Sequence, residues 1–118
     1  MANRLVHLEL HTGDLPGACS FYERLFDWEL HDIRADSRFY REVDLQGEVM
    51  GGVVECTTPI PRWLPYVEVR DIERTVDRAR ELGARVLLDP REGPAGWRSV
   101  IATPDAGEVA LWLPKPAD

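Results

Sequence analysis

Apolar and polar residues alternate along the segment LVHLELH, residues 5–11. Its even-numbered positions are apolar, whereas His7, Glu9 and His11 occupy odd-numbered positions. Successive side chains of an extended strand point to opposite faces of the sheet. The pattern therefore predicts a β-strand with one apolar face and one face that carries two imidazoles and a carboxylate.

The spacing of the apolar residues changes directly after this strand. From residue 15 to residue 26 they recur every three or four positions, which predicts an amphipathic helix with Asp14 as its N-cap. The same signals recur at residues 72–82, which follow Asp71 and end before Gly83. Outside the helices the pattern predicts strands at residues 28–33, 39–45, 49–56, 63–69, 85–88, 97–103 and 109–113, with a loop from Asp89.

Two short segments interrupt these elements. The segment 57–62 contains two prolines and lies near the middle of the chain, which indicates a linker. Gly51 and Gly52 are adjacent within the predicted strand 49–56. A glycine pair inside a strand indicates a place where the backbone bends or where another group approaches it closely.

The order strand, helix and three strands occurs twice, and the two helix caps lie 57 positions apart. This internal duplication predicts a single α+β domain, residues 1–118, of two tandem βαβββ modules. The modules span about residues 4–56 and 63–114 and are joined by the linker 57–62. With the helices outside, the other sheet faces are expected to enclose a cleft, where a ligand would bind.

Composition and charge narrow the choice of partners. Lys and Arg number 14 against 21 Asp and Glu, so the formal net charge is −7. Nucleic acid is not an expected partner, because phosphate binding needs clustered positive charge, whereas an acidic pocket favours a cationic or metal-bound ligand. The chain has no run of some 18 apolar residues to span a membrane and no signal-peptide pattern at its start, so we expect a cytoplasmic protein without a membrane partner.

Nearly all of the chain resembles the vicinal oxygen chelate (VOC) superfamily, which contains glyoxalase I, extradiol dioxygenases and the bleomycin-resistance proteins. The resemblance lies in VHLELHTGDLPGACSFYERLFDWEL, the glycine pair of VMGGVVE, PYVEVRDIERTVDRARELGARVL and PDAGEVALWLP. The most similar members are small glyoxalase-like proteins. The resemblance implies the paired-module fold, a small-molecule ligand and a homodimer.

Metal-using members of that superfamily place one ligand on the first strand and one on the last strand of each module. The resemblance puts His7, Glu55, Leu64 and Ala110 at these four positions. Leu64 and Ala110 cannot bind a metal, and an open metal site generally has three protein ligands. His7 and Glu55 are thus the candidate ligands of a divalent ion, with Glu9 as a substitute third group, and no other cofactor is indicated.

The polar and aromatic residues on the predicted inner faces form a candidate ligand-binding cleft. Glu9 lies near two imidazoles and is also a candidate for moving a proton in catalysis. The alternatives are structural, because an inward histidine is often only hydrogen-bonded and an aromatic residue is often core. The cleft residues are His7, Glu9, His11, Glu55, Tyr66, Glu68 and Trp112.

Two functions follow from this set, and the sequence leaves open whether there is catalysis. The first is binding of a small, cationic or aromatic molecule in the cleft, as in the bleomycin-resistance proteins. The alternative is a divalent-metal-dependent lyase, isomerase or dioxygenase of the glyoxalase type that uses His7 and Glu55. We favour binding, because two of the four metal-ligand positions are lost. An interaction module without a ligand is favoured least.

Overall fold

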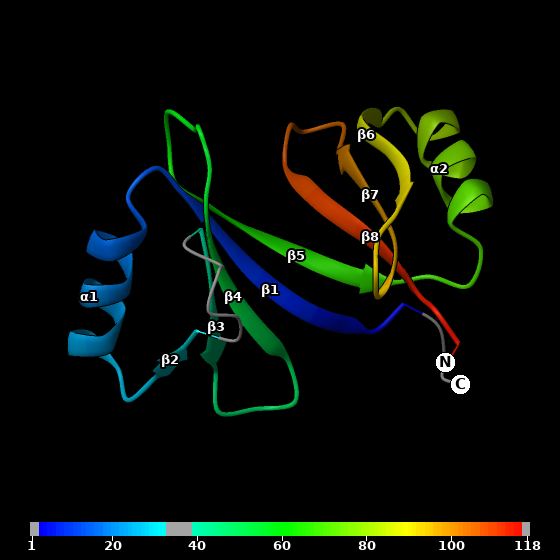
Figure 1. Cartoon of the computed structure of the whole chain (residues 1–118). Helices are drawn as coiled ribbons and strands as arrows, with labels where there is room; N and C mark the ends of the chain where they lie inside the picture. Colours follow the sequence, from blue (N-terminus) through cyan, green and yellow to red (C-terminus); the bar gives the residue numbers. More distant parts are fainter. Residues whose placement is uncertain (1–2, 33–38, 117–118) are drawn as a thin grey trace. The chain divides into compact units, whose positions relative to one another are not determined.

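The computed structural model describes residues 3–32 and 39–116. The chain divides into two compact units, which we describe separately (Figure 1). The first unit is His7–Leu64, and the second is Pro65–Asp118 together with Met1–Val6. Strands β1 (Leu5–Thr12) and β5 (Arg62–Glu68) each continue from one unit into the other.

The first unit contains helix α1 (Leu15–Leu25) and a sheet with the strand order β2-β3-β4-β1. Strands β1 and β4 are parallel, and the other neighbours are antiparallel. Ile33, at the end of the predicted strand 28–33, lies outside the described residues. The remaining strands are β2 (Glu29–His31), β3 (Tyr40–Asp44) and β4 (Met50–Glu55).

The second unit repeats this order with helix α2 (Ile72–Glu81) and the strand order β5-β8-β7-β6. Its parallel pair is β5 with β8, and the other pairs are antiparallel. The predicted α+β class and the two βαβββ modules are therefore confirmed. The later strands are β6 (Arg85–Glu92), β7 (Gly96–Ala102) and β8 (Glu108–Pro114).

The predicted loop from Asp89 is wrong at its start, since residues 89–92 continue strand β6. Pro90 cannot donate a backbone hydrogen bond, which is why the sequence favoured a loop there. Strand β6 lies at the edge of its sheet and its pairing with β7 is irregular between Leu88 and Arg91. A proline is tolerated at such an edge or bulge, because no ladder hydrogen bond is lost.

In each unit the helix covers one face of its own sheet and encloses a core. In the first unit Leu10, Val43 and Val53, from three neighbouring strands, pack with Leu15 and Cys19 of α1. Burying each large aliphatic side chain contributes about 1.5–3 kcal/mol. In the second unit the corresponding cluster is Val69, Ile72, Val76 and Leu111.

Both helices begin at the predicted aspartates. The Asp14 carboxylate accepts a hydrogen bond from Gly17 N at 3.0 Å, and that of Asp71 accepts one from Arg74 N at 3.0 Å. Helix α2 is followed by Gly83, whose φ is +96°. None of the described helices is long and apolar enough to cross a lipid bilayer.

Candidate functional site

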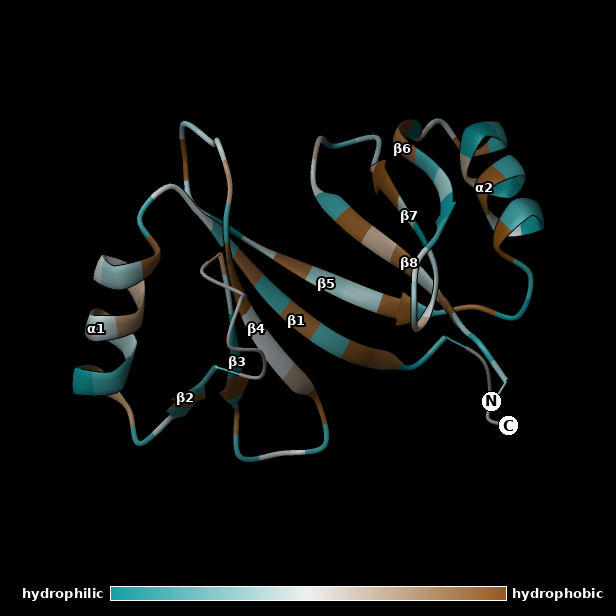
Figure 2. Ribbon diagram, in the orientation of Figure 1, coloured by the Kyte–Doolittle hydropathy of each residue, from teal (hydrophilic) through white to brown (hydrophobic). Residues whose placement is uncertain are grey.

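The side of β1 that carries His7, Glu9 and His11 points away from α1. Leu10 is in the core beneath the helix, so the odd-numbered residues of this strand point to the opposite side. Hydrophobic and hydrophilic residues alternate along β1 in Figure 2. The predicted two-faced strand is therefore confirmed, and it places His7, Glu9 and His11 together in the first unit.

Glu9 lies between the two imidazoles and is only 7% exposed. Its Oε2 is 3.2 Å from Nε2 of His7, and its Oε1 is 2.9 Å from Nε2 of His11. An ionised carboxylate only accepts hydrogen bonds, so both Nε2 atoms then carry the hydrogen. A buried carboxylate is costly unless it is paired in this way. The two histidines thus stabilise and orient the Glu9 carboxylate.

Strand register extends this face to β4 and β3. Glu9 is opposite Gly52 on β4, and Gly52 is opposite Glu42 on β3. One step further along, Val54 lies between His11 and Tyr40. Because paired residues share a face of the sheet, two carboxylates, an imidazole and a phenol surround Gly52 and Val54. We call this set (Glu9, His11, Tyr40, Glu42 and Gly52, with His7) the polar face.

Tyr40 was not among the predicted site residues, although the glycine pair that includes Gly52 indicated that another group could approach the backbone closely. A Cβ atom built on Gly52 would lie 2.5 Å from the Tyr40 hydroxyl and 2.8 Å from its ring carbons Cε2 and Cζ. The close approach expected at the glycine pair is therefore confirmed. On Gly51 the added atom would instead meet Leu45, at 2.7 Å from its Cγ.

The surroundings of Tyr40 disfavour the charged phenolate. Burial comes first, followed by the negative charges of Glu9 and Glu42, and together they raise the pKa of Tyr40 to about 12. The phenol is therefore neutral at physiological pH and keeps its hydrogen-bond donor. It is the aromatic member of a face that otherwise carries carboxylates and imidazoles.

Glu55 does not lie beside His7 in the structure. It is opposite Thr12 in the register of β1 and β4, five residues along from His7, which is roughly 16 Å at the usual rise of a strand. Its Oε1 accepts a hydrogen bond from Leu15 N at 2.9 Å. The Glu55 carboxylate thus satisfies a backbone donor at the N-terminus of α1, a favourable place for negative charge.

The donor set around His7 does not fit a divalent metal. Protein ligands of zinc converge on the ion at about 2.0–2.3 Å. Here Nε2 of each histidine faces a Glu9 oxygen at hydrogen-bond distance. Across residues 3–32 and 39–116, no group of three or more His, Cys, Asp or Glu side chains is arranged to hold an ion.

The other predicted cleft residues lie in the second unit. Tyr66 is buried, and its hydroxyl accepts a hydrogen bond from Arg98 at 3.1 Å. Its ring centroid is 6.4 Å from that of Trp112. Glu68 pairs with Arg4 at 3.0 Å. These residues are therefore held in contacts within their own unit, and the cleft between the modules stays a prediction.

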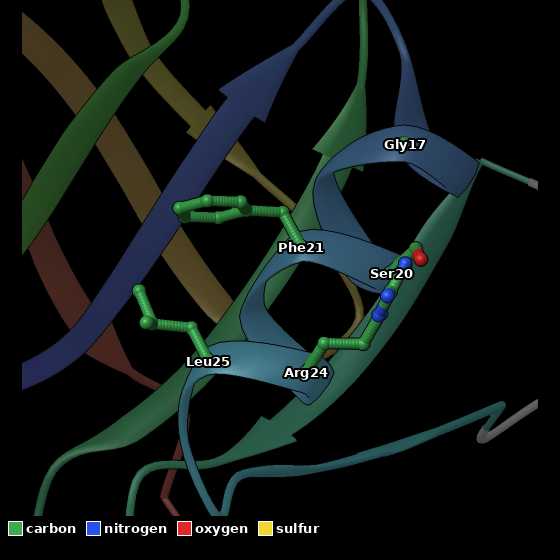
Figure 3. Close-up of a pocket in the computed structure, with 5 residues that line it drawn as sticks. All are labelled: Gly17, Ser20, Phe21, Arg24 and Leu25. Carbon is green, nitrogen blue, oxygen red and sulfur yellow. The ribbon is translucent and has the colours of Figure 1, made fainter.

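Two open hollows lie elsewhere on the first unit. One, of about 450 Å³, runs along α1, where Phe21 and Leu25 point to one side and Ser20 and Arg24 to the other (Figure 3). The other, of about 430 Å³, includes Glu55 and is also lined by Gly13, Phe39, Cys56, Thr57 and Thr58. Neither hollow includes a residue of the polar face.

Two βαβββ units in tandem, one of them with an ionisable sheet face, define a glyoxalase-type fold. Residues 4–111 match the family model described as the Glyoxalase/Bleomycin resistance protein/Dioxygenase superfamily. Because this match covers most of the chain, the protein belongs to that superfamily. The resemblance inferred from the sequence is thus confirmed.

Two curated relatives are similar to this chain in sequence. A protein of Mycobacterium bovis named "Putative glyoxylase CFP32" is 28% identical over 113 residues, which cover 89% of this chain and 43% of that protein. A Mycobacterium tuberculosis protein of the same name matches equally. The chain therefore spans less than half the length of these relatives.

The structural neighbours establish the fold alone, because their sequence identity is low. A hypothetical protein of Bacillus halodurans, BH1468, has a TM-score of 0.69 and 16% identity, with 100% of this chain and 99% of that chain covered. A glyoxalase/bleomycin resistance protein/dioxygenase superfamily member from Vibrio splendidus has a TM-score of 0.66 and 20% identity, covering 96% and 99%. Methylmalonyl-CoA epimerase from Mycobacterium tuberculosis has a TM-score of 0.60 and 22% identity, covering 95% and 88%.

Proposed function

We propose that this protein binds a small organic cation, with a flat or aromatic body, on the polar face of the first unit. The observation that carries the proposal is the Glu9 carboxylate, which is 7% exposed and held by two imidazoles. An opposite charge beside a buried carboxylate favours its charged form, so such a group favours a positively charged ligand. Binding rather than catalysis is the function we propose.

The balance of charge supports a cation. An ionised Glu9 carries one negative charge. Glu42 adds a second carboxylate on the far side of Gly52. The whole chain carries a formal charge of −7, which also attracts cations through its long-range field. An anionic ligand would be repelled by the same groups.

Tyr40 supports the proposal that the ligand has a flat or aromatic body. A phenol beside two carboxylates offers both an apolar surface and a ring that attracts cations. The superfamily description includes bleomycin-resistance proteins, whose name connects them with a drug. We therefore include bleomycin among the compounds to be tested, together with simpler flat cations.

A metal-dependent lyase, isomerase or dioxygenase is the competing function, and we do not propose it. Its two predicted ligands, His7 and Glu55, lie far apart along the sheet, and the Glu55 carboxylate is engaged by Leu15 N. The histidine nitrogens are engaged by Glu9. Among the described residues of the first unit, these side chains do not form a group that could hold a metal ion.

Thermal unfolding in the presence of matched compounds tests the proposal. Benzamidine is a flat cation and benzamide is its neutral counterpart, so the two differ mainly in charge. We expect benzamidine or bleomycin to raise the melting temperature in a saturable manner and benzamide to leave it unchanged. No shift with any cation, or equal shifts with benzamidine and benzamide, would contradict the proposal.

Metal content provides a separate check. After expression in medium supplemented with zinc, manganese, nickel and iron salts, we expect less than a tenth of an equivalent of metal per chain. A stoichiometric ion that is lost in the His7→Ala variant would instead support the enzyme. The homodimer and the cytoplasmic location stay predictions, and size-exclusion chromatography with light scattering tests the former.

A further inference from the structure

We infer that Tyr40 is a further ligand-binding residue of the polar face and that Gly52 is the residue that positions it. The inference rests on the proposed function, which it deepens by specifying the cationic group. Its ligand class is a cation that carries N–H donors, such as an amidinium, a guanidinium or a primary ammonium. Three observations lead to it: the strand register, the space above Gly52 and the charges beside the phenol.

The register brings Tyr40 to the polar face from a strand that does not touch β1. Tyr40 is on β3 and pairs with Val54 on β4, whereas Glu9 is on β1 and pairs with Gly52 on β4. The phenol of Tyr40 leans back along β4 by one pleat, over Gly52. It therefore lies between Glu9 on one side and Glu42, the other partner of Gly52, on the other.

Glycine at position 52 is required for space rather than for backbone conformation. Among the described glycines only Gly83 has a positive φ, so the backbone at Gly52 suits any residue. A Cβ atom there would nevertheless approach three atoms of the Tyr40 phenol within 2.8 Å. Real Cβ atoms do not come this close to a neighbour, so even alanine must displace the phenol. Gly52 thus acts through Tyr40.

The chemistry of the three side chains selects the cation. Two carboxylates accept hydrogen bonds, and a neutral phenol offers a lone pair beside them. A planar amidinium or guanidinium can donate to more than one of these oxygens at once, which a quaternary ammonium cannot do. Because its pKa is raised to about 12, the Tyr40 hydroxyl is neutral at physiological pH, where such cations are charged.

Isothermal titration with benzamidine tests the inference in four proteins. These are the unmodified chain, Tyr40→Phe, Gly52→Ala and the double variant. We expect each single variant to bind benzamidine about tenfold more weakly, as for the loss of one hydrogen bond near a charge. We expect the double variant to bind no more weakly than the single ones, because both changes remove the same contact. Tyr22→Phe is the matched control, because Tyr22 packs against the core cluster under α1, and it should bind as the unmodified chain does.

Alkaline titration of tyrosine absorbance locates the phenol without any ligand. We expect one phenol to ionise near pH 12 in the unmodified chain, to be missing in Tyr40→Phe and to ionise at lower pH in Gly52→Ala. Circular dichroism shows whether Gly52→Ala folds. If Gly52→Ala does not fold, the affinity of Tyr40→Phe for benzamidine alone decides whether Tyr40 binds the ligand.

The outcomes separate the inference from the proposed function. Loss of binding in Glu9→Gln with unchanged binding in Tyr40→Phe overturns the inference and leaves the proposed function standing. Failure of the unmodified chain to bind benzamidine, bleomycin or any other cation overturns both. Equal affinity for benzamidine and the tetramethylammonium ion overturns the assigned ligand class.

Discussion

The two units of this protein share one order of elements but carry different chemistry at corresponding positions. Glu9 on β1 corresponds to Tyr66 on β5, and their partners on the neighbouring strands are Gly52 and Ala110. In the first unit the phenol of Tyr40 comes toward the carboxylate from β3. In the second, Arg98 comes from β7 and donates a hydrogen bond to the hydroxyl of Tyr66.

The two units therefore have the same order of helices and strands but different charged groups on corresponding strands. The second unit supplies its own cations, because Arg98 engages Tyr66 and Arg4 engages Glu68. The first unit surrounds Glu9 with imidazoles and places a second carboxylate, Glu42, nearby. The face that we propose for a cationic ligand therefore lies in the first unit, and in the second unit Tyr66 and Glu68 are engaged by arginines.

The largest expected effect comes from removing the charge of Glu9. Glu9→Gln keeps the shape of the side chain, and we expect the affinity for benzamidine to fall about 100-fold, because a buried charge partner is lost. Glu68→Gln is the matched variant in the second unit and should change the affinity less than twofold. Isothermal titration measures both. Equal losses in the two variants would remove the distinction between the sheets.

The ionisation of Tyr40 predicts a pH dependence of stability. Its pKa is about 12 in the folded chain, above the ordinary value of 10. A raised pKa means that the stabilising contribution is complete below pH 10 and is lost as the pH rises toward 12. We expect the free energy of unfolding to fall by about 2 kcal/mol across this window.

Urea unfolding at pH 9, 10, 11 and 12 measures this fall. Tyr40→Phe has no phenol at this position, so its stability should decline by about 2 kcal/mol less over the same window. A decline of the same size in the variant would mean that other groups cause the pH dependence.

The helix caps should be equivalent in the two units, unlike the sheet faces. Asp14→Ala and Asp71→Ala each remove a side-chain acceptor for a backbone N–H of the first helical turn. We expect each to lower the free energy of unfolding by about 1 kcal/mol and to leave benzamidine binding unchanged. Urea unfolding measures the first effect and calorimetry the second. A change in affinity for Asp14→Ala alone would link α1 to the ligand.

The smallest effect is expected at Glu55. The Glu55→Gln variant keeps an oxygen that can accept from Leu15 N but loses the favourable charge at the helix N-terminus. We expect a loss of about 0.5 kcal/mol in stability. Benzamidine binding and metal content should both stay as they are in the unmodified chain. A variant that loses a stoichiometric metal would restore Glu55 as a ligand.

The sequence predicted most of the fold because local patterns determine it. Alternation in β1, the two aspartate caps and the repeated element order all depend on neighbouring residues, and the structure confirms each of them. The extension of β6 through Pro90 was missed. Its tolerance depends on the position of β6 at the edge of a sheet, which no local pattern reveals.

The candidate site could be predicted only in part, for a similar reason. His7, Glu9 and His11 are neighbours on one strand, so their shared face follows from the sequence. The positions of Glu55 and Tyr40 depend instead on the register between strands. A shift of a few residues along β4 places Glu55 at the start of α1 rather than beside His7. Tyr40 reaches the polar face from β3, and only Gly52 gave a sign of its approach.

A map of ligand contacts on the isotope-labelled chain tests directly whether the cation binds to the polar face of the first unit. Two-dimensional ¹H–¹⁵N NMR spectra would be recorded during titration with benzamidine and, separately, with benzamide. We expect saturable shifts of the backbone amides of residues 7–11, 40–42 and 52 with benzamidine and none with benzamide. Shifts centred on residues 66–68 and 98, or equal shifts with the two compounds, would contradict the proposal.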